Sequence, residues 1–129
     1  MKTLCLDFDG VIHSYVTPWQ SADVIPDRPV LGAMAFLAEA VRHFDVAIYS
    51  SRSNQEGGIP AMRDWLWKWL HEDLGAAGYE FDAVQEVFEA ISWPVVKPPA
   101  HVTLDDRALT FKGSWPEMGE LISFKPWNK

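Results

Sequence analysis

The fold of this chain is decided first by the stretch Leu-Cys-Leu-Asp-Phe-Asp-Gly, residues 4–10. Its apolar start predicts a buried strand over Thr3–Asp9, and Asp7 and Asp9 lie two residues apart, so both carboxylates point to the same side. Two like charges held together repel each other, and proteins keep such a pair for a bound cation or a shared proton. Gly10 then predicts a turn. Because an Asp-x-Asp pair is common on its own, the rest of the chain decides its meaning.

Two further apolar runs predict strands over Asp45–Ser50 and His101–Leu104. Apolar residues at helical spacing predict a helix over about Pro29–His43, between the first two strands. A second helix is expected to begin at Pro60 and to end at Gly75 or Gly78. Strands that alternate with helices predict a parallel sheet with helices on both faces.

The remaining segments give weaker patterns. Val11–Arg28 is expected to be a loop because it contains two prolines, and the ambiguous region after the second helix favours a short strand near Val87–Ile91. A short edge strand is expected at Ala108–Phe111. Ser114 to Glu117 has capping-box spacing, which predicts a final helix to about Ser123.

The predicted fold is therefore α/β, a single Rossmann-like domain over residues 1–129 without a large cap. In such sheets ligands bind at the carboxyl ends of the strands. The polar residues of this chain follow the predicted strands at those ends: Asp7, Asp9, Ser50, Arg52, Asp105 and Asp106. The sequence thus predicts one polar site at one rim of the sheet.

Composition narrows the function classes. The chain of 129 residues is 48% hydrophobic, carries a net charge of −7 and has a pI near 4.9. An acidic chain is a poor partner for extensive nucleic acid or for an anionic membrane surface, and no apolar run approaches the ~20 residues of a membrane span. The single cysteine, Cys5, cannot form an internal disulfide, and a reducing cytoplasm is the expected compartment.

The residue types at the predicted rim suit phosphoryl transfer. Acidic oxygens bind a hard cation such as Mg²⁺, which keeps water ligands that substrate oxygens can replace. A cation together with Lys97 and Arg52 would neutralise a phosphoryl group, and a carboxylate can attack phosphorus to form an aspartyl-phosphate. A second carboxyl group two residues later can protonate the leaving oxygen and then deprotonate the hydrolytic water.

With these residues in view, the chain resembles the haloacid dehalogenase (HAD)-like hydrolase superfamily. Four segments in order carry the resemblance: Leu-Asp-Phe-Asp-Gly-Val (Leu6–Val11), Ala-Ile-Tyr-Ser-Ser-Arg (Ala47–Arg52), Val-Lys-Pro around Lys97, and Leu-Asp-Asp-Arg (Leu104–Arg107). The four together are far more specific than any one alone. The departures are mild: Ile12 stands near the glycine where many members have threonine, and Tyr49 precedes the motif serine.

The resemblance implies a role for each matching residue. Asp7 would be the nucleophile and Asp9 the acid/base, and the backbone carbonyl of Asp9 would join Asp7 in binding Mg²⁺. Ser50, with Ser51 as an alternative, and Lys97 would hold phosphoryl oxygens. The substrate-binding residues would be Gly10, Ser51 and Arg52. Asp105 would be a direct metal ligand, and Asp106 would bind through water or orient the shell.

The resemblance also implies a Mg²⁺-dependent phosphatase of the minimal, uncapped type, because Val11–Arg28 and Ser53–Val96 leave little room for a cap domain. An uncapped site admits a phosphorylated substrate of any size, unless the loop or a partner copy in a homo-oligomer covers it. Nucleotide or polynucleotide ends remain one substrate class. Alternatives are a catalytically weak binding or regulatory domain on the same scaffold, a receiver domain, which Ser50 at the middle strand disfavours, and an interaction module that uses the tryptophans. His13, Tyr15 and Trp19 lie close enough in sequence to contact a substrate, Trp19 and Tyr15 by stacking.

Overall fold

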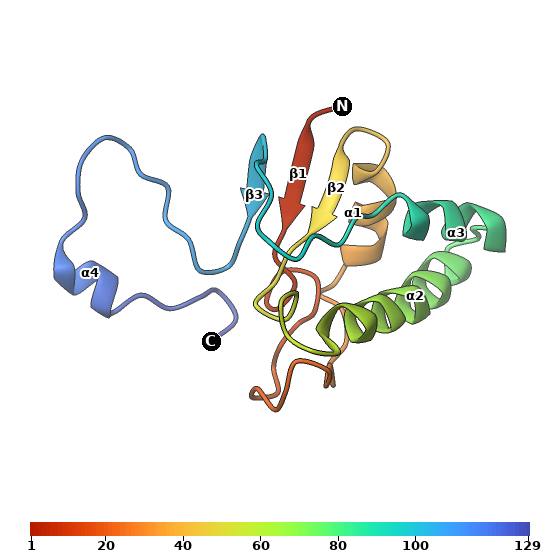
Figure 1. The fold of residues 1–129 in the computed structure, drawn as a ribbon, viewed down its shortest axis with the longest axis horizontal. Helices are drawn as coiled ribbons and strands as arrows, with labels where there is room; N and C mark the ends of the chain where they lie inside the picture. The colour runs from red at the N-terminus through yellow and green to blue at the C-terminus, as the bar shows by residue number, and fades with distance from the viewer.

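The computed structural model describes all residues from Met1 to Lys129. Its centre is a three-stranded parallel sheet in the order β2-β1-β3, with β1 at Thr3–Leu6, β2 at Asp45–Ile48 and β3 at Val102–Leu104 (Figure 1). All three strands were predicted from apolar runs. The arrangement confirms an α/β domain built on a parallel sheet.

The sheet has one strongly apolar face. Leu4 pairs with Val46 and Val102, and Leu6 pairs with Ile48 and Leu104. Because side chains alternate along a strand, these residues share one face, and Cys5, Ala47 and Thr103 share the other. On the first face the residues of β1 and β2 are buried, whereas those of the edge strand β3 are partly exposed.

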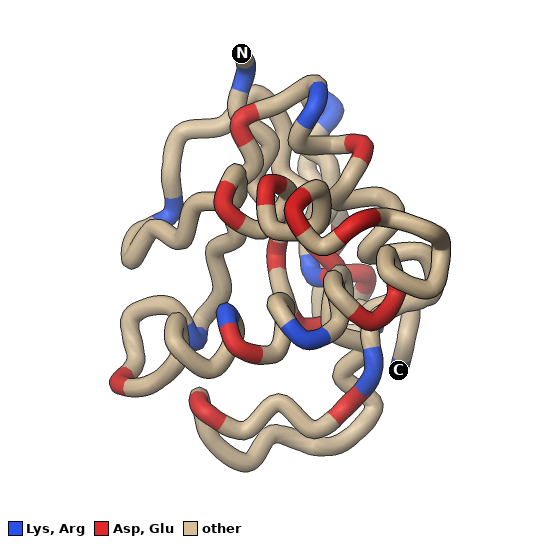
Figure 2. The backbone as a smooth tube through the Cα atoms, turned by 90° about the vertical axis from the view of Figure 1, so that its right-hand side faces the viewer, with Lys and Arg blue, Asp and Glu red and all other residues tan.

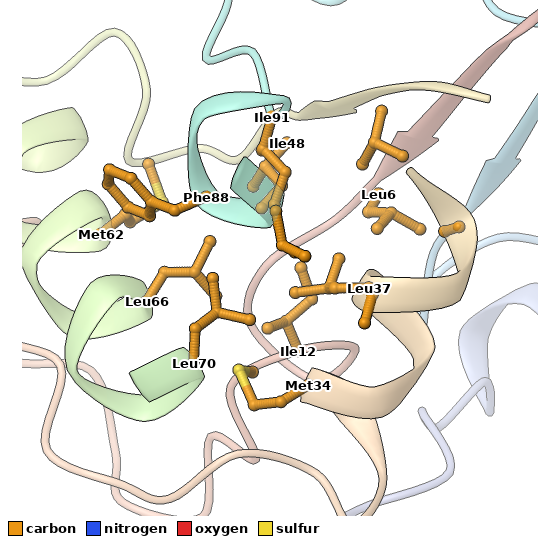
Figure 3. Packing of buried hydrophobic residues seen from close by; sticks show 14 of the residues in the cluster. Leu6, Ile12, Met34, Leu37, Ile48, Met62, Leu66, Leu70, Phe88 and Ile91 are labelled. Carbon is orange, nitrogen blue, oxygen red and sulfur yellow. The ribbon is translucent and has the colours of Figure 1, made fainter. Parts of the chain in front are cut away.

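Three helices cover this apolar face: α1 (Ala33–Ala40), α2 (Gly58–Ala76) and α3 (Phe81–Glu89). They contact one another, and their buried side chains join those of β1 and β2 in one cluster of 19 residues. Figure 3 shows Leu37 of α1, Leu66 of α2 and Phe88 of α3 pointing into the same core as Leu6 and Ile48. This cluster fixes the strand ends that carry the polar residues.

The sequence predicted helices on both faces of the sheet. This prediction was wrong for α1, α2 and α3, which all pack on the same apolar face. The segment Trp93–His101, which leads to β3, contains Pro94, Pro98 and Pro99, and closely spaced prolines prevent a helix. No helix therefore precedes β3 on the second face. Instead Lys97 lies beside Cys5 and Thr103, at the mouth of a small cavity described below.

The predicted strand at Val87–Ile91 was also wrong. Its first residues belong to α3, where Val84, Val87 and Phe88 are buried at helical spacing, and Ile91 follows in the same cluster. Only Ser92 forms a single bridge, to Ala47 of β2. A short apolar run fits either element, and packing against α2 decided for the helix.

The chain after β3 differs most from the sequence prediction. No strand forms at Ala108–Phe111, and the last helix, α4 (Met118–Ile122), starts later than Ser114 and has no buried residue. Figure 1 shows this segment leaving the sheet in a wide arc that carries α4 and returning toward the body of the molecule. Its capping-box residues form no side-chain cap on the helix, because α4 begins after Glu117.

The surface carries more acidic than basic residues. Figure 2, viewed from the side of α2 and α3, shows Asp and Glu spread over the helices with Lys and Arg between them rather than in a continuous basic stripe. No helix of the structure combines the length and the hydropathy needed to cross a bilayer.

Candidate functional site

Three carboxylates meet at the carboxyl end of the sheet. Asp7 directly follows β1, and Asp105 and Asp106 directly follow the neighbouring strand β3. The Asp7 amide donates a 3.0 Å hydrogen bond to the Leu104 carbonyl, which extends the strand pairing up to the site. One oxygen from each carboxylate lies within 4.8 Å of the others. This is the acidic cluster that the strand ends predicted.

Gly10 makes the close approach of Asp106 possible. Its φ of +81° lies in the left-handed region that glycine adopts without strain. A Cβ added there would collide with the Asp106 carboxylate, so any other residue would force the Asp106 side chain to move. This glycine therefore allows the turn after β1 to lie against the end of β3.

Asp7 is the most perturbed of the three acids. Burial raises its pKa, the hydrogen bond with Asp106 raises it further, and the outcome is a pKa of about 8 against an ordinary value near 3.8. Asp7 thus keeps its proton at neutral pH, which avoids the repulsion of a further charge beside Asp105 and Asp106. A cation among the three oxygens would remove this repulsion, and a set of hard carboxylate oxygens fits a hard divalent cation such as Mg²⁺.

A cavity of about 150 Å³ opens beside Asp7 and Asp105. Its polar lining includes Ser50, Ser51 and Lys97. Cys5, from the second face of the sheet, also lines the cavity, together with Tyr49 and Thr103. The buried Ser50 hydroxyl accepts a 3.1 Å hydrogen bond from the Arg52 amide, which leaves its O–H as a donor. A hydroxyl donor and an ammonium group that line the same space as two carboxylates suit an anion next to a cation.

Ser50 and Ser51 both line this cavity, so the structure keeps both alternatives for the motif serine. They differ in support. The Ser50 amide bonds to the Ser53 hydroxyl at 2.9 Å, and Ser50 is 2% exposed, whereas Ser51 is exposed. Ser50 is therefore the more rigidly held of the two.

Asp9 turns away from the acidic cluster and is held by other partners. Its two oxygens accept hydrogen bonds from Arg52 Nε at 2.9 Å and Nη2 at 3.2 Å, and Oδ1 also accepts one from His13 Nδ1 at 2.9 Å. Burial raises the pKa of Asp9, but these hydrogen bonds outweigh it and leave the pKa below the ordinary value. The Asp9 side chain is thus a carboxylate fixed beside the cluster. That its backbone carbonyl binds a metal stays a prediction.

Arg52 is placed differently from the substrate contact that the sequence suggested. Its side chain is buried, and its guanidinium makes five hydrogen bonds to protein acceptors. Besides the two to Asp9, three go from Nη1 to the carbonyls of Ser21, Ala22 and Val24, each at 3.0 Å. Arg52 therefore joins Asp9 to the loop at 11–28.

His13 is the residue whose role the sequence left open. It is fully buried, and its Nε2 accepts a 3.1 Å hydrogen bond from the Asp27 amide, which can only donate. Nδ1 therefore carries the proton that it donates to Asp9. The ring also stacks near Phe8 and meets Trp65 edge-on. Its position three residues after the glycine was the available signal, but the partner Asp27 lies 14 residues further along the chain.

The loop at 11–28 is held at several points. The Asp27 carboxylate accepts hydrogen bonds from the Thr17 amide at 2.8 Å and the Thr17 hydroxyl at 2.6 Å. The chain end adds three more hydrogen bonds to the same region. These go from Trp127 Nε1 to the Gly10 carbonyl, from Asn128 Nδ2 to the Ser14 carbonyl and from Lys129 Nζ to the Tyr15 carbonyl. The returning segment of Figure 1 thus fastens the turn next to the acidic cluster.

A second cavity, of about 170 Å³, adjoins the first at Asp7. Asp7 and Ser51 line both cavities, and the second is completed by Asp9, Tyr15, Trp19, Asp106 and Arg107. The cavity beside Lys97 and this partly aromatic cavity therefore meet at Asp7.

The structure brings together all the residues predicted for the site except the Arg52 side chain, which is withdrawn into the interior. Comparison with known proteins adds nothing to this geometry: no family model, curated protein or solved structure matches the chain.

Proposed function

We propose that this protein is a Mg²⁺-dependent phosphatase that hydrolyses phosphate monoesters through an aspartyl-phosphate on Asp7. The observation that carries the proposal is the meeting of the three carboxylates of Asp7, Asp105 and Asp106 with Ser50 and Lys97 around one small cavity. The resemblance of four sequence segments to HAD-like hydrolases supports the same chemistry. We propose with it that the fold is Rossmann-like.

Mg²⁺ bound by Asp7, Asp105 and Asp106 would offset the charge of the carboxylates and of the phosphoryl oxygens. Ser50 donates a hydrogen bond to one phosphoryl oxygen, and Lys97 neutralises another. Ionised Asp7 attacks phosphorus, the bond from phosphorus to the leaving oxygen breaks, and that oxygen takes a proton from Asp9 in its acid form. Water then attacks the same phosphorus and gives a proton back to Asp9, which frees inorganic phosphate and restores the Asp7 carboxylate.

Asp9 lies beside Asp7 in the second cavity, where the leaving group and the hydrolytic water would be found. As a carboxylate held by Arg52 and His13, it is ready to accept the proton of that water. Protonation of the leaving oxygen by Asp9 requires its acid form, which the same hydrogen bonds disfavour. The network therefore supports the base role of Asp9 more strongly than the acid role.

The test is hydrolysis of an aryl phosphate in Mg²⁺ buffer by wild-type protein and Asp7→Asn. We expect the variant to lose turnover while its circular dichroism is unchanged, and we expect a chelator to abolish the wild-type rate. Asp45→Asn is the matched control. Asp45 is the first residue of β2, at the end of the strand away from the acidic cluster, and its side chain is 65% exposed. Unchanged turnover in Asp7→Asn would refute the mechanism.

A catalytically weak regulatory domain on the same scaffold is the second candidate. Several hydrogen bonds hold both the loop at 11–28 and the Asp9 side chain. This rigidity favours a regulatory domain over an enzyme with an open site and fast turnover. A phosphorylated Asp7 that persists for minutes, detected by mass spectrometry after incubation with acetyl phosphate, would distinguish it from a phosphatase.

A further inference from the structure

We propose that the second cavity binds the leaving group of the phosphate ester and that this group contains a single planar ring, which stacks on Trp19. The proposal rests on the proposed function of the adjoining cavity and names the class of substrate that the site would take. Neither the acidic cluster nor the first cavity determines that class. It is argued from the position, the size and the lining of the second cavity.

Position comes first. The two cavities share Asp7 and Ser51 and otherwise have different walls. In-line attack by Asp7 on a phosphoryl group held by Ser50 and Lys97 sends the leaving oxygen away from the attacking Asp7 oxygen. The second cavity adjoins the first at Asp7 and Ser51 and contains Asp9, the residue that would exchange a proton with the leaving oxygen, so the ester group can extend into it.

The size of the cavity suits one ring. Its volume is about 170 Å³, and an apolar cavity of about 150 Å³ is known to hold a benzene molecule. A larger group would extend from the mouth into solvent. The volume therefore admits a ring attached close to the ester oxygen, and the lining decides whether a ring is preferred.

Trp19 gives the lining its chemical character. Its side chain lies in the cavity wall and is 42% exposed, so part of its apolar surface is open to a ligand. The Arg52 guanidinium lies over the ring, 4.5 Å from its centroid, and is itself fixed by five hydrogen bonds. Trp19 is thus a supported platform, and a bound ring would gain stacking contact while ordering little of the protein.

Tyr15 completes the aromatic lining from the same loop. It is the only non-glycine residue with positive φ, at 55°, a conformation that costs free energy and that marks functional positions in many proteins. Lys129 holds it there, with Nζ bonded to the Tyr15 carbonyl at 3.0 Å and lying 4.4 Å from the ring centroid. Two aromatic side chains are therefore held toward one small space next to Asp7 and Asp9.

The experiment compares two ligands that differ only in the ring. Benzylphosphonate and cyclohexylmethylphosphonate carry rings of the same size on the same linker, but only the first is planar and aromatic. Both resist hydrolysis, so titration calorimetry in Mg²⁺ buffer measures binding whether or not the protein turns over. We expect the wild-type protein to bind benzylphosphonate more tightly by about three- to ten-fold, the ratio that one aromatic contact supplies.

Trp19→Leu should remove this preference, and Trp19→Phe should restore most of it, which also shows that the loop still folds. Trp67→Leu is the matched control, because Trp67 is 41% exposed on α2 and does not line either cavity. Equal affinity for the two ligands in wild-type protein, or a preference that survives in Trp19→Leu, would overturn the proposal.

Turnover of the matching esters, benzyl phosphate and cyclohexylmethyl phosphate, separates this result from the proposed function. Hydrolysis of both at equal efficiency, with equal phosphonate affinities, would leave the phosphatase standing and overturn the ring pocket. Ring-selective binding lost in Trp19→Leu, without hydrolysis of either ester, would uphold the pocket and overturn the phosphatase.

Discussion

Arg52 offers the sharpest test of how the site is held together, and we expect Arg52→Lys to destabilise the protein markedly although it keeps the charge. The buried guanidinium reaches Asp9 with two nitrogens and three loop carbonyls with the third. A lysine ammonium is a single point with three donors, so it cannot reach the carboxylate and the carbonyls at the same time. Either Asp9 or the loop at 11–28 therefore loses its partner.

The size of the effect follows from the bonds that are lost. Losing the hydrogen bonds to two or three neutral carbonyls removes about 0.5–1.5 kcal/mol each, and losing one to a charged group removes about 1.5–3 kcal/mol. Because the Asp9 side chain is 13% exposed, water offsets part of this loss. We therefore expect a decrease of about 2–4 kcal/mol in the free energy of unfolding, a large share of the ~5–15 kcal/mol that is typical of a domain.

The assay is equilibrium unfolding in urea, followed by tryptophan fluorescence and by circular dichroism to check two-state behaviour. Arg42→Lys is the matched control, because Arg42 is 72% exposed and pairs only with Glu39 on the surface. The Arg42→Lys variant should lose no more than about 0.5 kcal/mol in the free energy of unfolding. If Arg52→Lys were no more destabilising than Arg42→Lys, the loop would not depend on the arginine and the reasoning would be refuted.

Two further predictions concern the turn after β1 and the loop that follows it. Gly10→Ala should weaken Mg²⁺ binding measured by calorimetry, because its Cβ collides with Asp106, whereas Gly32→Ala, at φ +83° with nothing within 4 Å, should lower stability without affecting the metal. Burial raises the pKa of Asp27, but hydrogen bonds from the Thr17 hydroxyl and amide lower it more, so the net pKa is below its ordinary value. This carboxylate therefore adds stability above its unfolded pKa of about 3.9 and loses it as the pH falls toward the folded value. The difference in unfolding free energy between wild type and Asp27→Asn should accordingly shrink as the pH falls from about 5 toward about 2. A difference that does not change with pH would contradict the assignment.

Local patterns were sufficient for the parts of the fold that lie along single segments. The apolar runs located all three strands, and the helical spacing located α1 and α2, although α1 proved shorter than the predicted range. The short apolar run at Val84–Ile91 was misread because strand and helix both accommodate it, and contacts with α2 settled the choice. The last helix was predicted too early because capping-box spacing also occurs where no helix follows.

The sequence by itself determined the acidic rim, because residues that directly follow parallel strands must meet at one edge of the sheet whatever the loops do. Only the tertiary structure decided that Arg52 faces inward, that His13 links Asp9 to Asp27, and that the chain end fastens the turn at Gly10. Apart from the contact between His13 and Asp9, which are 4 positions apart, these contacts join residues 14 to 117 positions apart. No periodicity or spacing encodes them, since their geometry is fixed only after the helices have packed and the loops have closed.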